Sequence, residues 1–208
     1  MSEMLKTKVH NVDVCVIGGG IGGMFTAISA ARHGAKVALM QDRPVLGGNC
    51  SSEIRMWISG AGTRVRDLQE TGIMEELLLE NMHRNPKRNF TTWDALLYEL
   101  VRFEDNIDLM LNCACCDAKM NGNKIEWVKG FQLTTYKWQT VRAKMFADCS
   151  GDSILAPLTG AEFRLGREAA SEFGRIMKQI GPLLGRKPAT VHQQITRGRR
   201  LLIDQCRK

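Results

Sequence analysis

The sequence has no long apolar run, and this absence limits the classes of protein that it can form. No hydrophobic stretch approaches the roughly 20 residues that span a bilayer. Residues 1–11 are polar and contain no apolar signal-peptide core. We therefore expect a cytoplasmic protein with no membrane partner. The 208 residues, 44% hydrophobic and 25% charged, suffice for one globular domain, or for one domain and part of another.

The sequence also lacks an even, clustered set of cysteines. It has seven, at scattered positions. An odd, scattered set with no export signal argues against a disulfide framework. We therefore expect the fold to depend on its hydrophobic core.

Acidic residues are nearly absent from the last part of the chain. Residues 175–208 hold nine Lys or Arg and a single acid, Asp204, whereas the rest holds 20 basic and 21 acidic residues. The formal charge of +7 therefore belongs to this segment alone. A whole-domain nucleic-acid footprint would be distributed differently. The run 197–200 is basic but has no interleaved aromatics, so we do not expect nucleic acid as a partner.

A glycine-rich turn organises the first part of the chain. A short apolar run, residues 12–17, predicts a buried strand, and residues 21–33 predict the helix after it. Gly18, Gly20 and Gly23 between them have the G-x-G-x-x-G spacing of a dinucleotide-binding turn. The first N–H groups of the helix, around Ile21 and Gly22, are expected to face the two phosphates. A second strand over 35–40 completes the unit.

The end of the second strand should contact the adenosine ribose. Asp42 lies 19 residues beyond Gly23, near the spacing of about 20 that the motif predicts. Gln41 is the alternative, because an amide at the final strand position can also hydrogen-bond a hydroxyl. The sequence leaves both residues as candidates.

A second group of glycines follows this strand. Gly47, Gly48 and Asn49 begin a loop of small polar residues that can line a cofactor with backbone donors. A nicotinamide-binding domain has no evident need of a second glycine turn here. This loop therefore favours FAD over NAD.

The remaining pattern predicts more helices and strands of an α/β fold. We expect a helix over 67–84, a helix capped by Thr91 or Thr92, and a strand over 107–111. Asn121-Gly122 predicts a hairpin within an antiparallel meander that extends to residue 141. A strand over 144–148 then returns to the parallel sheet. The predicted fold is a Rossmann-like FAD-binding domain with a parallel sheet, an inserted antiparallel β-meander and helices.

Several separated motifs resemble, in order, the FAD-dependent oxidoreductases grouped with the flavoprotein component of heterodisulfide reductase. The resemblance rests on residues 17–23, 41–49, 51–57, 66–73, 85–86, 147–152 and 160–168. It implies FAD as cofactor and flavin-dependent redox chemistry with an unidentified small-molecule substrate and electron donor or acceptor. Cys50 stands where members of that family often have serine.

The resemblance also assigns a role to Gly151 and Asp152. It implies that Asp152 hydrogen-bonds the ribityl or ribose region and that Gly151 permits close backbone approach. Asp152 is also placed to cap a helix over 153–158. The two roles are compatible.

The cluster Cys113-Ala114-Cys115-Cys116 has the residue type of a metal or iron–sulfur site, and the resembled family includes iron–sulfur members. The sequence has no second ligand group at workable spacing, and a closed site needs four ligands. Cysteine is also a common buried small residue. We favour core packing, and an iron–sulfur cluster stays as the lesser alternative.

The predicted organisation has three parts. Residues 1–11 are an N-terminal extension, 12–174 the FAD-binding domain, and 175–208 a basic tail. The resemblance stops near residue 174, which predicts a C-terminally truncated oxidoreductase. The expected function is electron or hydride transfer through flavin. The alternatives are an inactive flavin-binding fragment and an NAD-binding dehydrogenase domain. No catalytic side chain is assigned; Cys50, Glu53 and Arg55 are candidates only by their position in the second loop.

Overall fold

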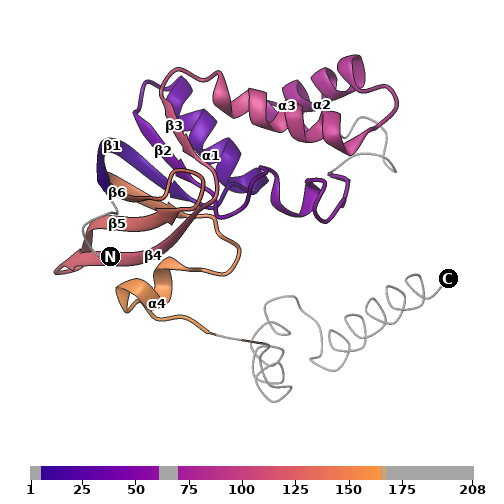
Figure 1. Cartoon of the computed structure of the whole chain (residues 1–208). Helices are drawn as coiled ribbons and strands as arrows, with labels where there is room; N and C mark the ends of the chain where they lie inside the picture. Colours follow the sequence, from indigo (N-terminus) through magenta and orange to yellow (C-terminus); the bar gives the residue numbers. More distant parts are fainter. Residues whose placement is uncertain (1–5, 61–69, 165, 167–208) are drawn as a thin grey trace, which may run out of the picture. The chain divides into compact units, whose positions relative to one another are not determined.

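The computed structural model describes residues 6–60, 70–164 and 166, and the fold below is formed within Met1–Phe163 (Figure 1). Two expectations fall wholly or partly outside the described residues. They are the basic tail over 175–208 and the beginning of the helix expected over 67–84.

Six strands form a single mixed sheet in the order β3-β2-β1-β6-β5-β4. The strands are β1 (Thr7–Ile17), β2 (Val37–Met40), β3 (Ile107–Met110), β4 (Cys113–Asn121), β5 (Lys124–Gln132) and β6 (Lys137–Asp148). Strand β1 pairs in parallel with β2 and β6, and β2 pairs in parallel with β3. Strands β4, β5 and β6 form the antiparallel meander, so the predicted α/β fold class is confirmed.

Strand β6 corrects the expected relation between meander and sheet. We expected the meander to end near residue 141 and a separate strand to follow over 144–148. Instead, β6 is one strand that pairs with β5 on one side and with β1 on the other, from Thr7↔Trp138 to Ile17↔Asp148. Strand β1 also begins at Thr7, so residues 7–11 belong to the sheet.

Four α-helices are described: α1 (Ile21–Arg32), α2 (Ile73–Arg84), α3 (Phe90–Arg102) and α4 (Leu155–Thr159). Helix α3 is capped by Asn89, whose side chain accepts the Thr91 N–H at 2.7 Å, so the expected cap at Thr91 or Thr92 is wrong. No helix in the described ranges has the length and apolar character needed to cross a membrane.

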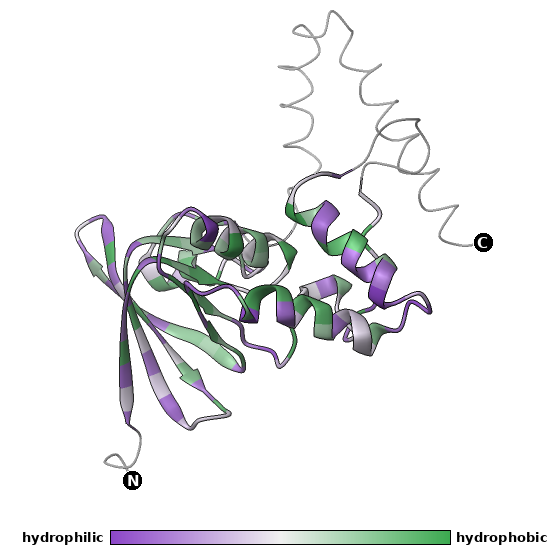
Figure 2. Cartoon of the chain, turned by 90° about the horizontal axis from the view of Figure 1, so that it is seen from above, coloured by the Kyte–Doolittle hydropathy of each residue, from purple (hydrophilic) through white to green (hydrophobic). Residues whose placement is uncertain are grey.

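Two hydrophobic clusters lie on opposite faces of the parallel strands, because alternate strand residues belong to different clusters. Figure 2 shows hydrophobic residues along both the sheet and the helices. Val16 of β1 and Leu39 of β2 pack toward α1, α2 and α3. Their neighbours Cys15 and Met40 pack toward the meander and α4. Because both faces are covered, these strands are continuous apolar runs, which is typical of a buried parallel sheet.

Candidate functional site

The turn between β1 and α1 has the geometry that its glycine spacing predicts. Gly18 has φ +100°, and a Cβ there would lie 2.4 Å from the Cys149 carbonyl oxygen. A Cβ on Gly23 would lie 1.8 Å from the Gly18 oxygen, so the helix packs against the turn at a distance that excludes other residues. Gly20 has no atom within 4 Å of its Cβ position and is open to a ligand.

The first turn of α1 is open to an anion. Its N-cap is Gly20, without a side-chain cap and without an acid in the first turn. The first helical bond runs from the Met24 N–H to the Gly20 oxygen at 2.8 Å, so the N–H groups of residues 21–23 have no partner inside the helix. The helix dipole adds partial positive charge at this end.

The loop that contains the second group of glycines lies directly against this turn. Gly47 and Gly20 form an isolated parallel bridge, and the Gly47 N–H donates to the Gly19 oxygen at 2.8 Å. Gly47 is left-handed at φ 100° and precedes a short 3₁₀ helix, η1 (Gly48–Cys50). The two glycine segments, separate in sequence, therefore form one surface.

Gln41 and Asp42 have different positions at the end of β2. The Gln41 side chain is buried; its oxygen accepts the Gly19 N–H at 2.6 Å, and its nitrogen donates to the Val45 oxygen at 3.0 Å. Gln41 therefore connects the glycine turn to the loop and has both ends occupied. Asp42 is exposed at the cavity and has no hydrogen-bond partner in the described ranges, so of the two side chains that of Asp42 is open to a ligand.

The segment after β6 brings Gly151 and Asp152 to the same edge. Gly151 has φ +83°, and Asp152 is exposed without a hydrogen bond to another described residue. The expected capping role of Asp152 is wrong. Asp148 performs it, accepting the Leu155 N–H at 2.8 Å while also accepting the Ser150 hydroxyl at 2.7 Å. Asp148 has no role assigned from the sequence, although the Asp-x-Ser pattern is typical of such local side-chain turns.

Two cavities meet at these residues. The larger, of about 660 Å³, is lined among others by Gly18, Gly20, Ile21, Asp42, Arg43, Gly47, Gly48, Asn49, Glu53, Trp57 and Asp152. The smaller, of about 170 Å³, is lined by Ile17, Gly18, Met40, Asp42, Cys113, Ala114, Cys115, Ser150, Asp152 and Ile154. Both share Gly18, Asp42, Ser150 and Asp152, so they are adjoining spaces around the glycine turn. The smaller one has largely apolar walls, which suit a flat base.

Cys50 is held as a neutral, structural thiol. It is 5% exposed, and its Sγ donates to the Gly47 oxygen at 3.1 Å. Burial raises the pKa of Cys50 to about 11, so the thiolate that redox chemistry requires is scarce at neutral pH. The Cys50 carbonyl accepts the Trp93 indole N–H at 2.8 Å, which ties the loop to α3.

The other two candidates of this loop also have partners. Glu53 lies 3.5 Å from the guanidinium of Arg43, measured between Oε2 and Nη1. Arg55 has φ 64°, donates to the Ser52 oxygen at 3.1 Å and lies over the Phe90 ring at 5.7 Å. Of the two, Glu53 alone lines the larger cavity.

The cysteine cluster at the start of β4 belongs to the core. Cys113 and Cys115 are 1% and 9% exposed and pack with Cys15 in the second hydrophobic cluster. Burial raises the pKa of Cys113 and of Cys115 to about 12 in each case, which favours the neutral thiol. In the described ranges, no three His, Cys, Asp or Glu side chains are placed to hold a metal ion.

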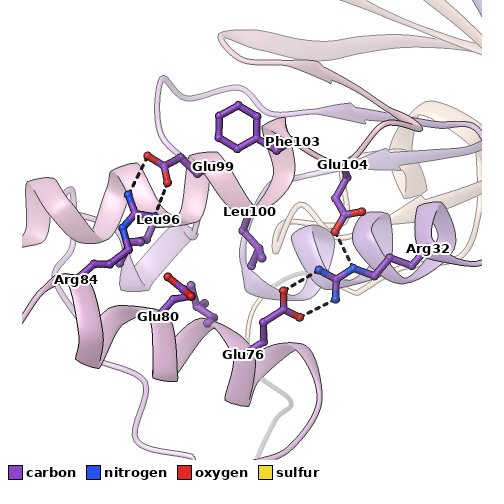
Figure 3. A pocket seen from close by; sticks show the side chains of 10 residues that line it. Arg32, Glu76, Glu80, Arg84, Leu96, Glu99, Leu100, Phe103 and Glu104 are labelled. Atoms are coloured by element: carbon purple, nitrogen blue, oxygen red, sulfur yellow. Dashed lines mark hydrogen bonds and ion pairs between the residues drawn. The ribbon is translucent and has the colours of Figure 1, made fainter.

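A third cavity, of about 300 Å³, lies among α1, α2 and α3, away from the glycine turn (Figure 3). Arg32 of α1 contacts Glu76 of α2 at 2.7 Å and Glu104 at 2.6 Å, and Arg84 contacts Glu99 at 2.6 Å. These ion pairs join α1 to α2 and to Glu104, which follows the end of α3, and they join α2 to α3.

A family model described as FAD dependent oxidoreductase matches residues 13–202. The match covers most of the sequence, and the chain belongs to this family. FAD is therefore its cofactor, and flavin-dependent redox chemistry is the class of chemistry that describes the family. The match extends past residue 174, where we expected the resemblance to stop, and includes most of the basic segment.

Curated relatives match over a short segment. The soluble pyridine nucleotide transhydrogenase of Chromohalobacter salexigens is 51% identical over 43 residues, 21% of this chain and 9% of that protein. The enzyme of the same name from Marinobacter nauticus is 48% identical over 42 residues, which are 20% of this chain and 9% of that protein.

A solved flavoprotein/dehydrogenase from Cytophaga hutchinsonii has a TM-score of 0.50 at 15% identity, over 76% of this chain and 44% of that one. At this identity, the likeness concerns the fold alone. The chain spans less than half the length of that protein.

Proposed function

We propose that this domain holds FAD in an extended form across the two adjoining cavities. The diphosphate lies at the uncapped start of α1, over Gly20 and Gly22, and the adenosine ribose lies at Asp42. The smaller cavity takes the adenine. The flavin end extends into the larger cavity along Gly47, Gly48 and Asn49, and Asp152 with Gly151 contacts the ribityl side.

One observation carries this proposal: two cavities of unequal size meet at an uncapped helix N-terminus beside two carboxylates without partners in the described ranges. The open Cβ positions of Gly20 and Gly22 leave room for phosphate oxygens. Free carboxylate oxygens are suitable acceptors for sugar and ribityl hydroxyls. The residues present therefore fit FAD.

FAD, when bound, supplies hydride or electron transfer, and the protein supplies position and electrostatics. In this chain, Gln41 fixes the glycine turn against the second loop, and Trp93 fixes that loop to α3. Both contacts are buried and arrange the backbone donors before a ligand enters. No described side chain is assigned as a catalytic base.

For the whole protein, we propose an oxidoreductase of the heterodisulfide reductase-like type, acting on a small molecule in the cytoplasm with a separate electron donor or acceptor. This subtype rests on the ordered motifs of the sequence. Neither the inactive fragment nor the NAD-binding dehydrogenase domain is favoured by the family match over residues 13–202.

The test is a titration of the purified full-length chain with FAD, followed by visible absorbance and flavin fluorescence. We expect stoichiometric uptake and a bound flavin that dithionite bleaches. Asp42→Asn should raise the FAD Kd about tenfold, because a charged hydrogen bond to the ribose is lost. Asp105→Asn, a matched change at an exposed acid outside both cavities, should leave the Kd unchanged. Binding of NAD without uptake of FAD would contradict the proposal.

A further inference from the structure

The larger cavity has an electrostatic imbalance. Three carboxylates line it, from Asp42, Glu53 and Asp152, against a single cationic side chain in the described ranges, that of Arg43. The diphosphate of FAD adds about two more negative charges. The N-terminus of α1 contributes only about half a positive charge. A further positive charge near the phosphates would therefore strengthen cofactor binding.

Arg43 is only weakly held by its present partner. Its guanidinium makes one ion-pair contact among the described residues, at 3.5 Å to Glu53, and the two side chains are 57% and 27% exposed. This distance is at the outer limit of a hydrogen bond. Exposed pairs of this kind add little stability. Most of the guanidinium donors have no described acceptor, so Arg43 can exchange partners readily.

The backbone of Arg43, in contrast, is fixed. Its carbonyl accepts the Asn112 N–H at 3.2 Å, and the neighbouring Gln41 side chain is bonded to the glycine turn. The loop that carries Glu53 is joined to that turn through the Gly20–Gly47 bridge. Arg43, Glu53 and the start of α1 line one cavity, so the Arg43 side chain lies in the space that the diphosphate would share.

We propose that Arg43 leaves Glu53 and pairs with the diphosphate when FAD binds, so that Glu53 competes with the cofactor for the guanidinium. The inference rests on the proposed function and adds a residue to it. The planar guanidinium can bind two phosphate oxygens at once, whereas its contact with Glu53 is single. Glu53 thus weakens FAD binding, and Arg43 strengthens it.

The test measures the FAD Kd of full-length variants by flavin fluorescence at low and high NaCl. Arg43→Gln should raise the Kd about tenfold and reduce its salt dependence, because a charged contact is lost. Arg43→Lys should recover part of the affinity, since it keeps the charge but not the planar fork. Glu53→Gln should lower the Kd about threefold by removing the competing carboxylate.

Arg102→Gln is the matched control, because Arg102 is exposed in the last turn of α3 and does not line the cavity. An Arg43→Gln protein with wild-type affinity, or with weaker binding but unchanged salt dependence, would overturn the inference and leave the proposed function intact. A wild-type chain that takes up no FAD would instead overturn both.

Discussion

At the scale of single residues, the glycine turn depends on the close packing of Gly23 in α1 against the backbone of Gly18. A Cβ on Gly23 would lie 1.8 Å from the Gly18 oxygen, which is a backbone atom in a turn fixed by the Gly18 N–H bond to Met40. Neither the Gly23 backbone nor the Gly18 backbone can move to make room for a Cβ without separating α1 from β1. The third glycine of the motif is therefore required for packing, before any ligand is considered.

We expect Gly23→Ala to lower the free energy of unfolding by about 3 kcal/mol, the upper end of the usual cost of overpacking a dense core. Thermal and urea unfolding of the purified chain measure this. Gly22→Ala is the control, because its Cβ position has no atom within 4 Å. Equal stability of both variants would show that the turn relaxes.

The spacing of residues predicts the role of glycines well, because a turn of this kind tolerates no other residue. Side-chain partners are harder to predict. Asp148 and Asp152 are both acids near the start of α4, and only the structure shows that Asp148 accepts the Leu155 N–H. Gln41 likewise has a structural role, because its amide lies between the Gly19 N–H and the Val45 oxygen.

At the scale of elements, Arg32 joins three helices. Its guanidinium contacts both Glu76 oxygens, at 2.7 and 2.8 Å, and reaches Glu104 after the end of α3. The Arg32 contact lowers the pKa of Glu76, so this carboxylate stays charged in mildly acidic solution. The contribution to stability is present above the ordinary pKa of a glutamate and is lost as the pH falls through the lowered pKa.

We expect Arg32→Gln to lower the free energy of unfolding by about 1 kcal/mol at neutral pH, since the pairs are partly exposed. The difference from the wild type should shrink in about 1 M NaCl and below about pH 4. Chemical denaturation at several pH values measures this. Arg102→Gln, at an exposed arginine in the same region, should have no effect. A loss that is independent of salt would mean that Arg32 acts through packing.

The sequence predicts elements that have a clear local pattern of apolar and small residues. It does not predict the bounds of a strand that depend on pairing with residues far away in the sequence. Helix α1 matches its expected range to within one residue. The sequence predicts β6 as two segments, because its side chains show no regular alternation of buried and exposed positions. The continuity of the strand comes from its pairing with β1 and β5. The cap of α3 was misplaced because Asn89, Thr91 and Thr92 all have side chains suited to capping.

At the scale of the whole molecule, a buried histidine connects three strands of the sheet. His10 of β1 is 7% exposed and contacts Asp108 of β3 at 2.5 Å and Gln139 of β6 at 2.8 Å. The Asp108 carboxylate raises the pKa of His10 above its usual value, against burial and the charge of Lys8, which lower it. His10 in turn lowers the pKa of Asp108.

A raised histidine pKa contributes stability below the ordinary pKa of about 6.5, and this is lost as the pH rises through the folded value. The lowered pKa of Asp108 contributes above about 4 and is lost in acid. We therefore expect this pair to stabilise the fold most between about pH 4 and 6.5. Asp108→Asn should reduce the fall in unfolding free energy above about pH 6.5, measured by urea unfolding across this range. His83→Gln, at an exposed histidine, should reproduce the wild-type profile.

The pairing of β1 with β6 has a consequence for how the chain is made. Strand β1 leaves the ribosome before the other strands of its sheet, yet its neighbour on one side is complete only at Asp148. Because contacts between such distant segments form late, the emerging chain carries an unpaired apolar edge while the intervening segments are synthesised. The Cys149 backbone, which packs against Gly18, arrives with the same strand. The nucleotide-binding turn is thus translated before most of the sheet, and its packing against the Cys149 backbone can be completed only after β6 has been made.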